Sequence, residues 1–140
     1  MQRLFTIFTF TLLASFALAQ PNPDVRIKQF SNLPALKHWA VEEPFGGGSL
    51  DILSHSGREI AIANRMLTSG LLSSEVTVFV RRSIGWDEAL NLGPYASDSV
   101  AFKQDGDTVI LKLANSGQEL LRFSIQGMHR QREYHGKRHE

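Results

Sequence analysis

The chain has 140 residues, no cysteine, and 15 basic against 14 acidic side chains. Without cysteine it can form no disulfide, use no thiol nucleophile and carry no lipid on a cysteine. The near-balance of charge argues against nucleic acid as the main partner, because such binding depends on an excess of basic side chains.

The first 19 residues have the features of a cleavable signal peptide. One basic residue, Arg3, precedes an uncharged apolar run over residues 4–14, and small residues stand at Ala17 and Ala19. A charged start, a short apolar middle and an Ala-x-Ala end form the pattern of a secretory signal. The run is shorter than the ~20 apolar residues that span a bilayer, and threonines interrupt it. We therefore expect residues 1–19 to be removed and the mature protein to be secreted or periplasmic, without a membrane span.

The mature chain is predicted to be one domain with short flanks. Loss of Arg3 leaves 14 basic residues to balance the 14 acidic ones. Residues 20–23 contain two prolines and are predicted to be a Pro-rich linker, because proline fixes φ and lacks an N–H group. Residues 24–125 are long enough to form a single β domain with its own core. Residues 126–140 are basic, contain histidine and have few apolar side chains, so we expect a disordered tail.

The first predicted strands are short. Val25–Lys28 alternates apolar with charged residues, as a half-buried strand does. Trp39–Phe45 is a candidate extended segment that Pro44 interrupts. Leu50–Leu53 is a candidate strand, and His55–Arg58 follows it as a turn.

The segment over residues 59–72 fits two structures. Ile60 and Ile62 follow a tight turn and alternate with other residues, which favours a strand. Ile60, Ala63, Leu67 and Leu71 also share one face of a helix, so a short helix over residues 62–72 is the alternative.

The second half of the chain is richer in strand signals. Glu75–Arg81 alternates β-branched and other residues and is the clearest strand. Gly93–Pro94 is predicted to be a turn. Residues 97–125 are predicted to form a three-stranded antiparallel meander, with an Asp-Gly hairpin turn at Asp105–Gly106 and a second turn at Asn115–Gly117. This rhythm of strands and turns predicts an all-β fold, a small antiparallel β-sandwich or barrel.

Three histidines in the tail are candidate metal ligands. Imidazole is a common ligand of zinc and copper, and His129, His135 and His139 lie close together in the sequence. No carboxylate pattern completes a known metal motif, so a solvated polar tail explains the same residues. A third interpretation is weak electrostatic contact with anionic surfaces, which strengthens as the histidines become protonated.

Three aromatic residues are candidate ligand contacts. Trp39, Trp86 and Tyr95 could stack on sugar rings if they lie on an exposed β surface. Nearby carboxylates could bond to hydroxyls or flank a glycosidic bond; these are Glu42, Glu43, Asp87 and Glu88. The competing interpretation is that these large rings are partly buried structural residues.

Two further motifs are explained by turns. Asp105 and Asp107 flank a glycine as calcium ligands can, but no further ligands follow at the required spacing. His55 lies between Ser54 and Ser56, yet adjacent residues of an extended chain point in opposite directions, which argues against a shared catalytic site.

The sequence therefore favours an exported non-catalytic β domain with a binding or structural role in the cell envelope or extracellular space. Its expected partner is a protein or a polysaccharide, and no cofactor or catalytic residue is assigned. One alternative is a small secreted hydrolase that uses carboxylates or His38 and His55. A second alternative is a metal-handling protein that uses the histidines of the tail.

Overall fold

A computed structural model describes residues 27–44, 47–68, 72–96 and 99–130. The predicted signal peptide, the linker at 20–23 and residues 131–140 of the predicted tail lie outside these ranges. Within them, no helix is long and apolar enough to cross a membrane.

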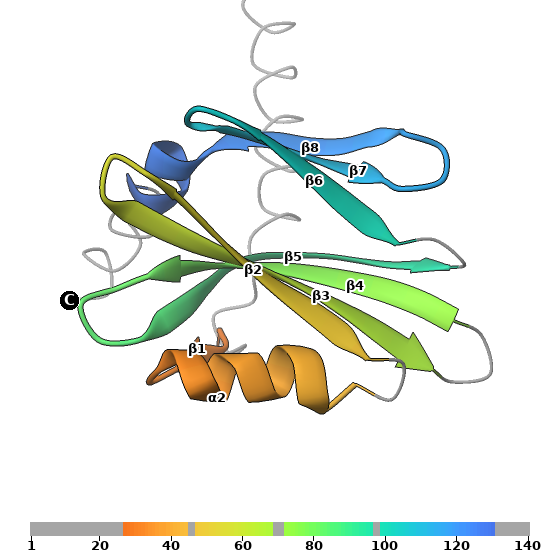
Figure 1. The fold of residues 1–140 in the computed structure, drawn as a ribbon, viewed down its shortest axis with the longest axis horizontal. Helices are drawn as coiled ribbons and strands as arrows, with labels where there is room; N and C mark the ends of the chain where they lie inside the picture. Colours follow the sequence, from red (N-terminus) through yellow and green to blue (C-terminus); the bar gives the residue numbers. More distant parts are fainter. Residues whose placement is uncertain (1–26, 45–46, 69–71, 97–98, 131–140) are drawn as a thin grey trace, which may run out of the picture.

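The described chain is mostly β, in two antiparallel sheets, which confirms the predicted all-β class. Sheet A has five strands in the order β1 (Gln29–Phe30), β5 (Trp86–Ala96), β4 (Leu72–Arg81), β3 (Arg58–Thr68) and β2 (Gly48–His55). Sheet B has three strands in the order β6 (Val100–Asp105), β7 (Thr108–Leu113) and β8 (Glu119–Ser124). Helix α2 (Leu33–Lys37) runs into a π-helical turn, η1 (His38–Glu42). Sheet B covers one face of sheet A and the helix covers the other, so the fold has three layers (Figure 1).

Strand β4 is buried on both faces. Val76, Val78 and Val80 join side chains of sheet B in one core cluster. Phe79 belongs to a second cluster that includes Leu36 of α2. These three valines and Phe79 are all fully buried. A strand covered on both sides has an almost continuous apolar sequence, which is why this segment is the clearest strand in the chain.

The segment predicted to be extended at Trp39–Phe45 is helical up to Glu42, and that prediction is wrong. The Asn32 side chain accepts a hydrogen bond from the Ala35 N–H at 2.8 Å and caps the N-terminus of α2. Pro34 stands in the first turn, where a missing N–H costs no helical hydrogen bond. Helical spacing then places Leu36, Trp39 and Ala40 on one buried face.

Gly93 and Pro94 lie within β5, not in a turn as the sequence predicted. Ser74 pairs with Tyr95 and Val76 pairs with Leu92, so the single β4 residue between them faces two residues of β5. This is a β-bulge, one of the few places in a sheet where proline is accepted.

Other predictions from the sequence agree with the structure in whole or in part. Residues 58–68 form strand β3, which resolves the strand-or-helix alternative in favour of the strand. The meander is confirmed as β6, β7 and β8. Its first hairpin turns at Gly106 and Asp107, one residue later than predicted, with Gly106 at φ +61°. Of the strand predicted at 25–28, residues 25 and 26 lie outside the description, and the observed β1 begins at Gln29.

The start of the predicted disordered tail is helical. Residues 125–130 form a helix in which Ile125, Met128 and His129 are buried. Asp107 caps this helix, because its carboxylate accepts from the Gln126 N–H at 3.1 Å and its carbonyl accepts from the Ile125 N–H at 2.9 Å. The described tail therefore packs on the domain as far as residue 130.

Replacement of Met128 should test this packing. Met128 is 7% exposed and belongs to the core between the sheets, so Met128→Ala should destabilise the protein by about 2–5 kcal/mol. Arg130→Ala is the matched control, because Arg130 is exposed and should change stability by less than about 0.5 kcal/mol. Urea unfolding followed by tryptophan fluorescence measures both. Equal midpoints for the two variants would show that the helix does not contribute to the core.

Candidate functional site

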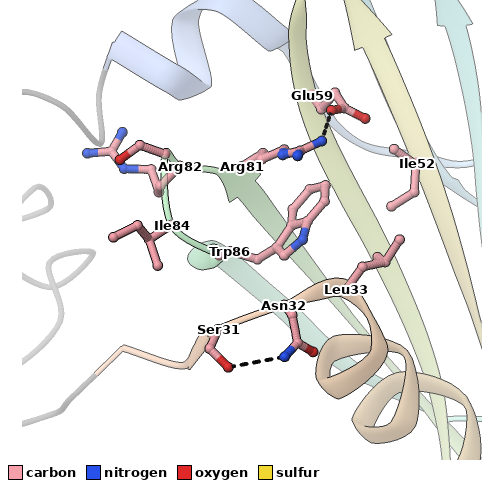
Figure 2. Close-up of a pocket in the computed structure, with 11 residues that line it drawn as sticks. Ser31, Asn32, Leu33, Ile52, Glu59, Arg81, Arg82, Ile84 and Trp86 are labelled. Carbon is pink, nitrogen blue, oxygen red and sulfur yellow. Dashed lines mark hydrogen bonds and ion pairs between the residues drawn. The ribbon is translucent and has the colours of Figure 1, made fainter.

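A shallow depression lies on the helix-covered side of sheet A, beyond the N-terminus of α2. It has a volume of about 440 Å³. Its lining comes from Ser31–Leu33 before and at the start of α2, from Ile52 of β2, from Glu59 of β3, and from Arg81–Trp86 in the β4–β5 hairpin. We call these residues the apolar depression (Figure 2).

The three most exposed large hydrophobic side chains of the described chain all line the apolar depression, with Leu33 and Ile52 on one side of the Trp86 ring and Ile84 on the other (Figure 2). They are Leu33 (42% exposed), Ile52 (39%) and Ile84 (83%), and each belongs to a different element. Single exposed apolar residues are ordinary on protein surfaces, whereas a contiguous group marks a candidate interaction site.

Charged groups surround the apolar side chains. The Arg81 guanidinium lies 5.9 Å from the centre of the Trp86 ring and pairs with the Glu59 carboxylate at 2.5 Å (Figure 2). Arg82 pairs with Asp87 at 3.5 Å. The side chain of Arg81 remains 58% exposed, so its ion pair with Glu59 is open to water and contributes little to stability. Arg81 can therefore reorganise around a bound partner at small cost.

The position of the β4–β5 hairpin depends on Gly85. Gly85 has φ +79°, and a Cβ atom there would lie 2.1 Å from the Phe30 carbonyl oxygen. The hairpin is closed by a hydrogen bond from the Arg82 N–H to the Gly85 carbonyl at 2.9 Å. Glycine thus lets the hairpin pack directly on the backbone of β1, and this contact fixes one wall of the depression.

The two tryptophans among the aromatic residues predicted to bind a ligand are both buried. Trp39 is 8% exposed and Trp86 is 4% exposed. The Arg65 guanidinium lies 4.1 Å from the centre of the Trp39 ring. Of the two tryptophans, only Trp86 lines the depression. Tyr95 lies in β5, but its side chain lies outside the described part. Burial of both tryptophans leaves little ring surface on which a sugar could stack.

The predicted histidine site is only partly described. His129 is 6% exposed, and its Nε2 lies 2.7 Å from the Glu59 carbonyl oxygen, so this histidine holds the C-terminal helix against β3. His135 and His139 lie outside the described residues. Among those that are described, no group of three metal-ligating side chains is found. The three-histidine site therefore stays a prediction, with His129 already engaged in the fold.

The groups named for a hydrolase do not meet in the depression. His38 pairs with Glu42 at 2.5 Å on the exposed side of η1. His55 ends β2 beside the Ser56–Gly57 turn. Within the described lining, Glu59 is the single carboxylate and no histidine is present. A hydrolase that works through a pair of carboxylates or histidines needs both groups in reach of one substrate, and the described lining does not bring such a pair together.

Sequence patterns missed the residues that define the depression. Leu33 and Ile52 belong to a helix and a strand, and nothing in their spacing separates them from core positions. Ile84 carries the one available signal, because a large apolar residue between Ser83 and Gly85 has no packing role in a tight hairpin turn.

Replacement of Gly85 should test how the hairpin wall is set. Gly85→Ala combines a strained positive φ with a backbone clash, so it should cost about 1–3 kcal/mol more than a change with strain alone. Gly57→Ala is the matched control, because Gly57 has φ +77° and open space around its Cβ position. Urea unfolding compares the two variants. Equal destabilisation would contradict the close approach of the hairpin to Phe30.

Comparison of the chain with protein-family models, with curated proteins and with solved structures found no match. Its function is therefore inferred from the residues and geometry of this chain alone.

Proposed function

We propose that this protein is an exported, non-catalytic binding domain that binds a polypeptide partner at the apolar depression. The observation that carries the proposal is that Leu33, Ile52 and Ile84, the exposed large hydrophobic residues of the described chain, all line one depression. Full burial of an exposed aliphatic side chain of this size contributes about 1.5–3 kcal/mol. Leu33 and Ile52 are already more than half buried, so a partner gains only the remainder from these two and the largest share from Ile84.

The surroundings of these side chains resemble the centre of a protein interface. Such interfaces combine an apolar centre with a polar rim, and they are enriched in arginine. Arg81 and Arg82 supply this rim beside Ile84. A polysaccharide partner is less well supported, because sugar recognition uses exposed aromatic rings and both tryptophans are buried.

The scaffold suits a binding role. Both sheets have open strand orders and share one core cluster, which supports a small sandwich rather than a closed barrel. A rigid sandwich presents loops and sheet edges to partners without change in its core. The apolar depression lies where a hairpin loop, a helix end and a sheet edge meet.

The export half of the proposal rests on the predicted signal peptide. Expression in a secreting host should give a mature protein that begins at Gln20, because Ala17 and Ala19 fit the cleavage site. Ala19→Arg should block cleavage, since the peptidase accepts only small residues there. Intact-mass spectrometry reads both results. An unprocessed wild-type chain retained in the cytoplasm would contradict export.

The binding half is tested by site-specific crosslinking in extracts of the native cell surface. A photoreactive residue in place of Ile84 should give protein adducts, and the variants Leu33→Glu and Ile52→Glu should reduce their yield at least about tenfold. Ser116→Glu is the matched control, because Ser116 is exposed in the β7–β8 turn, away from the site. Adducts that survive both glutamate substitutions, or adducts with polysaccharide alone, would refute a polypeptide partner at this depression.

A further inference from the structure

Strand β2 is the outer strand of sheet A and has an open edge. It pairs only with β3, from Gly48 opposite Arg65 to His55 opposite Arg58. Gly47 accepts a hydrogen bond from the Met66 N–H of β3, so its carbonyl points toward β3. The Ser54 carbonyl instead accepts from the Gln104 side chain of β6 at 3.1 Å, so it points away from β3.

These two carbonyls fix the direction of the others. In an antiparallel strand the N–H and C=O groups of one residue point to the same side, and the side alternates along the strand. Gly48, Leu50 and Ile52 therefore direct their backbone groups outward, like Ser54. Leu50 and Ile52 make no backbone hydrogen bond outside the strand ladders to any described residue. The outward edge is thus open from Gly48 to Ile52 and ends at Ser54.

The side chains next to this edge are incompletely covered on the helix side. Figure 2 shows Ile52 and Leu33 on the same side of the Trp86 ring. Ile52 is 39% exposed and Leu33 is 42% exposed. Sheet A has no described strand beyond β2, so no strand packs on Ile52 from outside. An additional strand paired with β2 would place every second side chain against these two residues.

An exposed carboxylate lies on the opposite face of β2, the face toward sheet B. Asp51 lies on the same face of β2 as Leu53, which belongs to the core shared with sheet B. Asp51 is exposed and forms no ion pair or side-chain hydrogen bond with a described residue. An added strand that carries a basic side chain on this face would pair with it, because opposite charges on neighbouring strands attract.

We infer that the β2 edge takes up an extended segment of another protein as a sixth strand of sheet A. This inference rests on the proposed function and names the form of the partner. The segment has apolar side chains on the face toward Ile52 and Leu33, and lysine or arginine on the face toward Asp51. Main-chain hydrogen bonds to Leu50 and Ile52 supply affinity, and the alternate side chains supply specificity.

A second copy of this chain fits the edge less well. Its own β2, Gly48–His55, has Asp51 as its single charged residue and no lysine or arginine. Symmetric pairing of two β2 strands therefore brings no positive charge to Asp51. The edge lacks the proline and lysine residues with which many edge strands prevent pairing, so it remains able to pair with a strand of complementary charge.

The test uses two synthetic, blocked octapeptides as probes. One alternates valine with lysine and the other alternates valine with glutamate. Fluorescence anisotropy should show saturable binding of the lysine peptide and weaker binding of the glutamate peptide to the wild-type protein. Asp51→Lys should reverse this preference by about fivefold or more. Asp105→Lys makes the same charge change in the β6–β7 hairpin and should leave the preference unchanged.

Backbone pairing is measured separately by hydrogen exchange. The lysine peptide should slow exchange at the amides of Leu50 and Ile52, and a version with alternate N-methylated peptide bonds should not bind. An unchanged preference in Asp51→Lys, or no added protection at these two amides, would overturn the strand-addition mode. If the crosslinking at residue 84 still depends on Leu33 and Ile52, the binding domain stands and only the strand mode fails.

Self-association is the remaining outcome. Sedimentation of the wild-type protein should show a monomer at micromolar concentration. A dimer that Ile52→Lys dissociates would assign the edge to a second copy and would overturn the inference of a foreign strand.

Discussion

Burial of sheet A on both faces is the constraint from which the candidate site follows. Phe79 and Val80 are adjacent in β4, face opposite sides, and are both fully buried. Sheet B covers one face of sheet A, and the helical segment α2–η1 covers the other. The helix is shorter than the sheet that it covers, however. The α2–η1 segment has ten residues and spans roughly 15 Å, while the ten residues of β4 span roughly 33 Å. The helix cannot cover its whole face of the sheet.

The two ends of the sheet that the helix leaves uncovered differ in the apolar side chains exposed there. At one end, Arg65 stacks on the ring of Trp39, and its guanidinium lies 4.0 Å from the Glu75 carboxylate. Asn91 adds hydrogen bonds to Glu75 and Thr77. Long polar side chains therefore close that end. At the other end Arg81 and Glu59 pair beside Trp86 in a similar way, but Leu33, Ile52 and Ile84 also remain exposed there, which produces the apolar depression.

Sequence patterns predicted the elements whose signals are local. β4, the β3 strand and the three-stranded meander follow from alternation and from turn residues, which act over a few positions. The helix was missed because its signals, Asn32 as N-cap and Pro34 in the first turn, precede a segment in which Pro44 and Phe45 favour extended structure. β5 was missed because Gly93–Pro94 is typical of a turn, and only pairing with β4 turns it into a bulge. Met128 and His129 are buried by long-range contacts with no local signal.

The candidate site was beyond prediction for the same reason. Whether an isoleucine is core or surface depends on which elements cover it, and the short helix and the missing sixth strand are properties of the assembled fold. Ile52 shows this most clearly: Leu53 beside it is 8% exposed, whereas Ile52 is 39% exposed because its side of the edge lacks a cover. The apolar depression arises because the sheet is larger than the layer on its helix side, and through Ile52 it adjoins the open edge of β2. A partner strand that satisfies the backbone of this edge would also bury its aliphatic side chains, so hydrogen bonding and apolar burial would act on the same ligand.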